Sequence, residues 1–418
     1  MNSEKGTIID LQKRVAESSR SALDSILREG AQRMLKAAIE LEVTEYIEAC
    51  KDLTDGAGRR LVVRNGFLPE RNILTGAGSL PVTKPRVHDR REGHSFTSKI
   101  LPPYLRRSPT IDTLIPALYL KGISTGDFQE ALEAILGEGA AGLSPANIVR
   151  LKEGWEQEYE EWSKRDLTGK RYVYFWADGI FFNVRLTKER PCVLVLMGTL
   201  PDGKKELLGL VDGERESKLS WKELLLDLKR HGLEEGPQLA VADGALGFWP
   251  ALEEVFPGAQ EQRCWVHKTA NVLDKMPKSI QPAAKEKIHE MYLSPTKRTA
   301  LEAYDDFLAL YEDKFPKACE CLRKDKDVLF TFYDFPAAHW QHLRTTNPIE
   351  STFATVRHRT RQTKGCGSRT ATLSMVYKLG REAEKKWRRL NGHELIIKLM
   401  TGTRFVDGIE QSSERIAA

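Results

Sequence analysis

Three acidic residues of this chain, Asp178, Asp243 and Glu350, lie in contexts that favour chemistry over simple solvation. Asp178 is inside RYVYFWADGIFFNVRL (171–186), where apolar residues occupy both parities, as in a strand buried on both faces. An ionised carboxylate there is costly unless a cation, a metal ion or a cleft compensates it. The alternative is that Asp178 and Gly179 form a hairpin turn, and the residues alone leave both interpretations open.

A second Ala-Asp-Gly sequence places Asp243 at the end of the apolar run QLAVADG. If the strands that carry Asp178 and Asp243 are neighbours, the two side chains converge at one edge of the sheet. Paired carboxylates of this kind bind hard divalent cations, because Mg²⁺ prefers oxygen ligands. The other two Asp-Gly pairs differ in context: Asp202 follows a proline in a predicted turn, and Asp212 is predicted to lie in a loop.

Glu350 is the predicted third carboxylate and lies in RTTNPIESTFATVRHRTRQTKG. Asn347 is a predicted helix cap and Pro348 suits the first turn, so Glu350 is alternatively the acid of a capping box. The same face of the predicted helix carries three cations suited to phosphates: Arg357, Arg361 and Lys364. This pattern indicates a metal-binding acid followed by a phosphate-binding surface.

Cys264 and His267 lie three residues apart in QRCWVHK, between Asp243 and Glu350. They are candidate zinc ligands, but a structural zinc site needs four ligands and no second His lies at zinc-finger spacing from the later cysteines. The interval from 269 to 343 has the pattern of amphipathic helices. It is too long for a bare connection, which predicts a helical insertion between the acid-bearing segments.

The elements expected to position the aspartates follow an α/β order. The run around Asp178 is followed by two strand-like runs, PCVLVLMGTL and KKELLGLV, then by a helical pattern over 217–232 and the strand before Asp243. Three strands, a helix and a further strand is the order of a ribonuclease-H-like core, in which a mixed sheet has helices on its faces.

The N-terminal part of the chain has a different residue pattern. Residues 7–50 carry apolar positions at helical spacing, which predicts two or three helices that form a core or a dimer contact. Residues 59–90 are interrupted by glycine and proline and predict a small arginine-rich β-ribbon, with Asn65-Gly66 as a turn.

Helical segments are predicted after the ribbon, over 110–120, over DFQEALEAIL and from Ser144 onward, where Pro145 suits the first turn. Two short helices separated by a glycine-rich turn fit a helix-turn-helix motif. Asn147 and Arg150 would then lie on the helix that enters the major groove. An ordinary helical bundle has the same pattern, so the sequence leaves both alternatives open.

Composition bounds the class of protein. A chain of 418 residues suggests two or three domains, and its net charge of +5 is mild, although basic runs such as KPRVHDRR and KKWRR are of the kind that contact phosphates. The N-terminus has no signal-peptide pattern and no apolar run is long enough for a membrane helix. The 6 cysteines have no disulfide-framework spacing, so we expect reduced thiols and an intracellular protein.

The chain resembles the Mutator-type transposases of bacterial insertion sequences, a branch of the DDE transposases. The resemblance rests on the strand around Asp178, on VADGALGFWPALEEVFPGAQEQRCWVHK and on RTTNPIE, with weaker similarity back to RNGFLPER and LYLKGIST. It implies that Asp178, Asp243 and Glu350 are the catalytic triad, and that Cys264 and His267 form the family's Cys-x-x-His signature. It also implies a ribonuclease-H-like α/β fold with an all-helical insertion, preceded by a mainly helical DNA-binding region with a small β-ribbon.

Six segments are predicted on this basis: an N-terminal helical region (1–58), a DNA-binding region (59–165), the first part of the catalytic core (166–268), a helical insertion (269–343), the last part of the core with the Glu350 helix (344–400) and a C-terminal tail (401–418).

The function expected from the resemblance is that of a Mg²⁺- or Mn²⁺-dependent DNA transposase with two ions held by Asp178, Asp243 and Glu350. Its partners would be double-stranded DNA, namely terminal inverted repeats and target DNA, and a second copy of the chain or a larger assembly. Cys264 and His267 are assigned to the substrate DNA. The expected location is the cytoplasm, in association with the nucleoid. Two alternatives remain: a catalytically silent DNA-binding regulator and a structure-selective nuclease.

Overall fold

The computed structural model describes residues 2–111, 114, 118, 128–136, 145–181, 192–213, 216–244, 247–362 and 369–411. The chain divides into two compact units, Met1–Leu151 and Lys152–Ala418. Among the described helices, none combines the length and apolar character that a membrane span requires. The five described cysteines are free.

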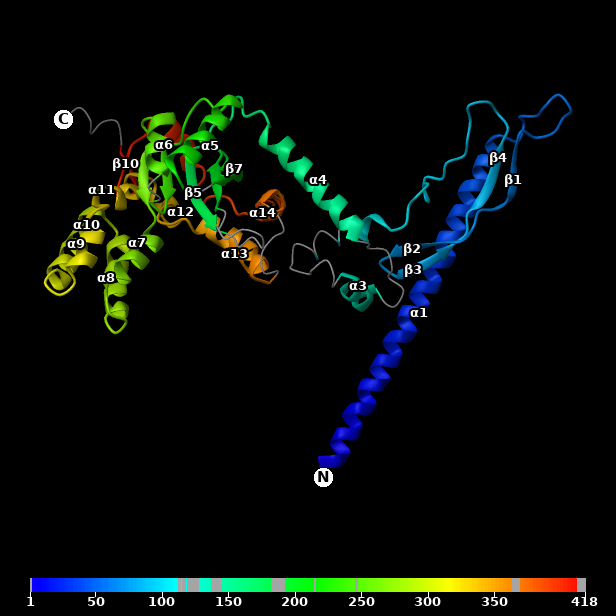
Figure 1. Cartoon of the computed structure of the whole chain (residues 1–418), viewed down its shortest axis with the longest axis horizontal. Coiled ribbons are helices and arrows are strands. Elements are labelled where there is room, and N and C mark those ends of the chain that lie inside the picture. The colour runs from blue at the N-terminus through cyan, green and yellow to red at the C-terminus, as the bar shows by residue number, and fades with distance from the viewer. Residues whose placement is uncertain are drawn as a thin grey trace. The chain divides into compact units, whose positions relative to one another are not determined.

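The first unit is built on one long helix, α1 (Asn2–Ala49), of 48 residues (Figure 1). The prediction of two or three helices over this stretch was wrong. No proline interrupts α1, and its isolated glycines lower helix stability by only about 1 kcal/mol each, which is too little to end it. One side of α1 packs through Ile39 on a small apolar core that includes Ile73, Leu80 and Val82.

The predicted β-ribbon is present as two antiparallel pairs. Strand β1 (Val62–Phe67) pairs with β4 (Pro85–Asp89), and β2 (Arg71–Thr75) pairs with β3 (Gly78–Val82). The prediction of a turn at Asn65-Gly66 was wrong, because both residues lie within β1. The pairing register of β1 with β4 shifts between Arg64 and Phe67, which indicates a β-bulge. Gly66 has a φ of 68°, so the positive φ that favours glycine in turns occurs here in a bulge.

The described helices that follow the ribbon include α3 (Phe128–Leu136) and α4 (Pro145–Ser163). Most of the helix predicted over 110–120 lies outside the described residues. The turn of the predicted helix-turn-helix lies outside the described residues, so the motif stays a prediction. Helix α4 continues through the acidic segment WEQEYEEW without a break.

The second unit contains a five-stranded mixed sheet in the order β7-β6-β5-β8-β9. Strands β5 (Tyr174–Phe181), β6 (Cys192–Thr199) and β7 (Lys205–Gly213) are antiparallel neighbours, and β8 (Leu239–Ala242) and β9 (Gln260–Arg263) run parallel to β5. Asp202 lies in the predicted turn between β6 and β7, whereas Asp212 lies inside β7 and not in a loop, because β7 pairs with β6 as far as Gly213.

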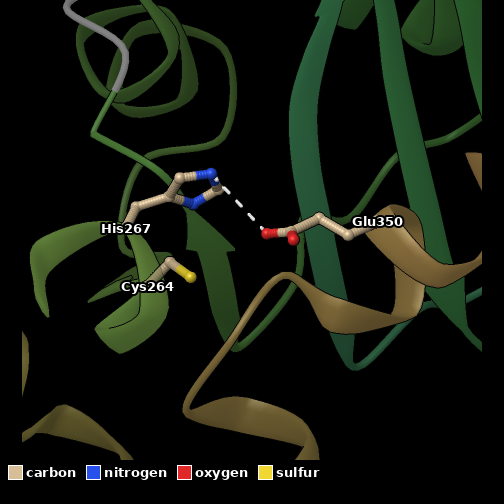
Figure 2. Close-up of side chains that lie close together, drawn as sticks. All are labelled: Cys264, His267 and Glu350. Atoms are coloured by element: carbon tan, nitrogen blue, oxygen red, sulfur yellow. Dashed lines mark ion pairs between the residues drawn. The ribbon is translucent and has the colours of Figure 1, made fainter. Parts of the chain in front are cut away.

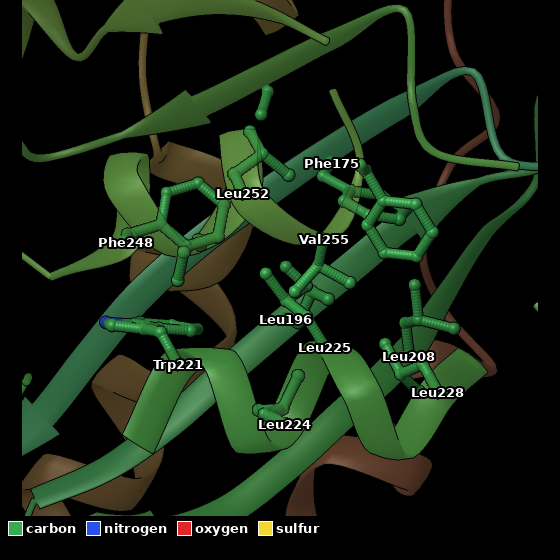
Figure 3. Packing of buried hydrophobic residues seen from close by; sticks show 14 of the residues in the cluster. Phe175, Leu196, Leu208, Trp221, Leu224, Leu225, Leu228, Phe248, Leu252 and Val255 are labelled. Atoms are coloured by element: carbon green, nitrogen blue, oxygen red, sulfur yellow. The ribbon is translucent and has the colours of Figure 1, made fainter. Parts of the chain in front are cut away.

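Two helices cover one face of this sheet. Helix α5 (Lys218–Arg230) connects β7 to β8, and α6 (Phe248–Val255) connects β8 to β9. Their apolar sides pack with Phe175 and Leu196 of the strands, as Figure 3 shows. Trp221 of α5 packs against Phe248 of α6, with their ring centroids 4.9 Å apart.

The opposite face of the sheet is covered by later segments of the chain. Tyr174 and Trp176 of β5 are hydrogen-bonded to this layer: the Tyr174 hydroxyl to Nδ1 of His339 at 2.7 Å, and the Trp176 indole to the carbonyl of His342 at 3.0 Å. Because side chains alternate along a strand, Asp178 projects to this same face. Helix α13 (Asn347–Gln362), which carries Glu350, contacts β5.

The remaining elements are mostly helical, as predicted for the interval 269–343, although the first of them begins at Trp265. They are α7 (Trp265–Leu273), α8 (Gln281–Leu293), α9 (Lys297–Tyr311), α10 (Pro316–Arg323), α11 (Lys326–Leu329), η1 (Thr331–Asp334), η2 (Ala337–His339) and α12 (Trp340–Leu343). After α13 come α14 (Arg369–Glu384), α15 (Leu395–Met400) and a short hairpin of β10 (Phe405–Val406) and β11 (Ile409–Glu410).

Replacing Trp221 tests the packing of α5 on the sheet. Trp221 is 1% exposed, so Trp221→Ala should lower the free energy of unfolding of this unit by about 3–5 kcal/mol. Trp221→Phe should cost less, because the buried indole N–H has no hydrogen-bond partner to lose among the residues that the structure describes. Calorimetric melting of the full chain measures both changes. Equal destabilisation by the two variants would contradict this account.

Candidate active site

The two predicted catalytic aspartates lie on neighbouring strands. Ala177 of β5 pairs with Ala242 of β8 in parallel register. Asp178 is the next residue of β5 and Asp243 directly follows the last residue of β8, and neighbouring strands are about 4.8 Å apart. The backbone therefore carries the two carboxylates side by side at the centre of the sheet.

Asp178 does not belong to a hairpin turn. Beyond it, Gly179 pairs with Leu194 and Phe181 pairs with Cys192, so β5 continues past the aspartate as a paired strand. Asp178 is only 7% exposed. A buried carboxylate beside a second one carries a strong electrostatic cost, which a bound cation would remove.

A fourth carboxylate, Glu216, lies close to this pair and was not found from the sequence. It precedes α5, and a Cβ built on Gly179 would overlap its carboxylate, so the glycine after Asp178 leaves room for Glu216. Burial, together with the charges of Asp243 and Asp178, raises the pKa of Glu216 to about 7. In the sequence Glu216 is one acid in the charged run GERESK, with no spacing that distinguishes it from a solvated residue.

The glycine after Asp243 also makes room for a charged side chain. Gly244 has a φ of 83°, and a Cβ there would overlap the guanidinium group of Arg263. Arg263 is buried at the end of β9 and pairs with Asp325 at 3.1 Å. The two Asp-Gly sequences thus accommodate neighbouring side chains at the end of the sheet.

Glu350 lies in the first turn of α13, but not as the acid of a capping box. The backbone N–H groups of Ile349 and Glu350 donate to the carbonyl of Thr346, at 2.9 and 3.1 Å, so Thr346 is the cap of the helix. The prediction that Asn347 is the cap was wrong. A capping-box acid accepts the N–H of the cap residue. Here the Thr346 N–H donates to Sγ of Cys264 at 3.3 Å, and Glu350 accepts from the Thr346 hydroxyl at 3.0 Å.

Cys264 and His267 lie at the start of α7 and face Glu350, as Figure 2 shows. Nε2 of His267 is 3.6 Å from Oε1 of Glu350. The potential ligand atoms of Cys264, His267 and Glu350 all lie within 4.8 Å of one another. This described cluster has one ligand fewer than a structural zinc site needs. Cys264 is 0% exposed, so its thiol is not placed for a direct DNA contact.

The thiol and the imidazole change each other's protonation. A hydrogen bond to Cys264 raises the pKa of His267 to about 9, and the charges of Asp243 and Glu350 contribute. Burial alone would raise the pKa of the Cys264 thiol, but its interactions with His267 and Thr346 outweigh burial and lower it. With a pKa of about 9, the imidazole of His267 holds a proton at neutral pH, which places a positive charge among the carboxylates.

The predicted phosphate-binding and DNA-reading residues are placed only by their backbone. Arg357 and Arg361 lie in α13 at helix positions on the same face as Glu350, while their side chains are outside the described part of the chain. Asn147 and Arg150 lie in α4, also without described side chains, and Lys364 is itself outside the described residues.

Neutralising Glu216 should stabilise the protein only at higher pH. Its pKa in the folded chain is about 7, against 4.5 for an ordinary glutamate. The stability linked to its proton is therefore present below pH 4.5 and lost as the pH rises through 7. In EDTA, Glu216→Gln should raise the melting temperature by a few degrees near pH 8 and change it little near pH 4. Glu223→Gln, at an exposed position of α5, is the control. A shift equal at both pH values would contradict the assignment.

Comparison with known proteins identifies a family. A model described as "Transposase, Mutator family" matches residues 2–390. The transposase for insertion sequence element IS6120 of Mycolicibacterium smegmatis is 50% identical over 295 residues, which are 71% of this chain and 91% of that protein. The transposase for IST2 of Acidithiobacillus ferrooxidans is 48% identical over 288 residues, covering 67% and 95%.

Similarity extends to more distant relatives. The transposase for insertion sequence element IS256 in transposon Tn4001 of Staphylococcus aureus is 27% identical over 344 residues, covering 81% of this chain and 85% of that protein. The family model spans both compact units, and the similarity therefore includes the N-terminal unit as well as the sheet that carries the aspartates. This chain belongs to the Mutator family of transposases.

Proposed function

We propose that this DNA transposase binds the terminal inverted repeats of an insertion sequence and catalyses metal-dependent strand cleavage and strand transfer through Asp178, Asp243 and Glu350. The observation that supports it most is the register of β5 and β8, which sets two carboxylates at adjacent positions beside a buried strand. Glu350 approaches from α13, on the face to which Asp178 projects.

The donor atoms suit a hard divalent cation. Asp178 and Asp243 offer only oxygen ligands, as Mg²⁺ and Mn²⁺ prefer, and Glu350 would complete the set. Bound there, two such ions supply activation of the attacking oxygen and stabilisation of the leaving oxygen in phosphoryl transfer. The carboxylates would orient the scissile phosphate, while Arg357, Arg361 and Lys364 would bind the neighbouring phosphates.

The arrangement of the second unit supports a ribonuclease-H-like core. Three antiparallel strands are followed by a helix and two strands parallel to the first, with α5 and α6 on one face. We assign 166–268 and 344–400 to this core and 269–343 to a helical insertion that separates Asp243 from Glu350. Residues 1–58 and 59–165 would form the helical and DNA-binding regions, and 401–418 the tail.

The partners follow from the reaction. Transposition joins two DNA ends, so we infer that a homodimer or a larger assembly acts on double-stranded DNA that includes the terminal repeats and the target. The helix-turn-helix with Asn147 and Arg150 would read the repeats. The cytoplasm, in association with the nucleoid, is the inferred location.

Removing one proposed metal ligand should separate chemistry from binding. Asp243→Asn should lower strand transfer by more than about 100-fold with Mg²⁺ or Mn²⁺, while binding of the DNA ends stays within about 3-fold of wild type. Asp202→Asn is the control, since Asp202 lies in a turn, where it accepts the N–H of Lys204 at 2.9 Å. A strand-transfer assay on the ends that flank the gene, with a parallel binding assay, measures both.

The outcomes distinguish the alternatives. Retained strand transfer by Asp243→Asn would refute the assignment. If wild type and Glu350→Gln both bind the ends and neither cuts, a regulatory role replaces catalysis. Hydrolysis without joining, independent of the repeat sequence, would instead indicate a nuclease.

A further inference from the structure

We propose that Thr346 is a positioning residue that connects the Cys264–His267 pair to Glu350, so that the Cys-x-x-His sequence serves to orient the third carboxylate. The inference rests on the proposed function, in which Glu350 takes part in the reaction. It gives the Cys-x-x-His sequence a role that does not require Cys264 to contact DNA.

The Thr346 hydroxyl lies among three functional groups. It is 3.0 Å from Oε1 of Glu350, 3.4 Å from Nδ1 of His267 and 3.4 Å from Sγ of Cys264. Thr346 is 0% exposed, so water does not compete for these contacts. A hydroxyl has a single proton, and the shortest of the three contacts is the one to the carboxylate.

The surrounding groups are placed to match the two polar groups of Thr346. Nδ1 of His267 faces the Thr346 oxygen at 3.4 Å, and Nε2 faces Glu350 at 3.6 Å. The Thr346 hydroxyl donates to Glu350 at 3.0 Å, while Sγ of Cys264 accepts the Thr346 backbone N–H at 3.3 Å. The hydroxyl and the backbone N–H of Thr346 therefore have different acceptors.

The network also reaches the strand that carries Asp243. The N–H of Cys264 donates to the carbonyl of Ala242, the last residue of β8, at 2.8 Å. The next N–H, of Trp265, donates to the carbonyl of Arg344 at 2.8 Å, two residues before Thr346. The start of α7 therefore connects the end of β8 to the start of α13. Through Thr346, the position of Glu350 becomes linked to the strand that carries Asp243.

The experiment compares two substitutions of Thr346 in the full-length protein. Thr346→Val keeps the shape but removes the hydroxyl, and we expect kcat for strand transfer to fall by about 10–100-fold with little change in KM for DNA, because small displacements of a reacting group have effects of this size. Thr346→Ser restores the hydroxyl and should return kcat to within about 3-fold of wild type.

Thr345→Val provides a matched control. Thr345 is also buried, at 8% exposure, and its hydroxyl accepts the N–H of Asn347 at 3.4 Å. It should keep a near wild-type kcat, and melting temperatures of all three variants report any general loss of stability. Loss of kcat in Thr346→Ser as well as Thr346→Val, or an unchanged kcat in Thr346→Val, would overturn the proposal.

Mn²⁺ binding provides a readout that does not depend on turnover. Calorimetric titration with Mn²⁺ should show weaker binding to Thr346→Val than to wild type, Thr346→Ser or Thr345→Val, since Glu350 loses its orientation. If the wild-type protein joins no DNA ends, the proposed function fails, yet this titration still decides the role of Thr346. Equal Mn²⁺ affinity in all four proteins would refute it.

Discussion

The parallel pairing of β5 with β8 is the constraint on which the rest of the site depends. It places Asp178 and Asp243 at adjacent positions, and the aromatic residues before Asp178 bury that part of the sheet. Asp178 is buried and Asp243 is partly exposed, and two neighbouring carboxylates repel each other. The elevated pKa of Glu216 reflects the same concentration of negative charge.

Neighbouring positive charge partly compensates these carboxylates. The imidazolium of His267, favoured by the buried Cys264, lies within electrostatic range of Asp243, Glu216 and Glu350. The glycines after the two aspartates leave space for Glu216 and Arg263 instead of making hairpin turns. The charged side chains and the glycines that make room for them thus lie together at one end of the sheet, where the transposase would act on DNA.

Helix beginnings position the groups that come from outside the strands. Cys264 precedes α7 and Thr346 precedes α13, and each makes contacts that a lone helix would not provide. The thiol of Cys264 accepts the N–H that a capping-box acid would otherwise take, which leaves the carboxylate of Glu350 to the Thr346 hydroxyl and His267. A residue pattern typical of a simple cap therefore forms part of the candidate site.

Local patterns in the sequence determined much of this protein. The strand around Asp178, the helix over 217–232 and the turn at Asp202 were predicted correctly, because alternation, helical spacing and turn chemistry act over a few residues. The same rules gave wrong predictions where other contacts compete locally. Asn65-Gly66 lies in a bulge and not in a turn, and Asp212 lies in a strand and not in a loop. The cap of the Glu350 helix is Thr346 and not Asn347. Only the tertiary structure decided which carboxylates lie close together. The strand register and the contacts of Glu216 and Thr346 connect residues that are far apart in the chain, and sequence periodicity reports only on neighbours along the chain.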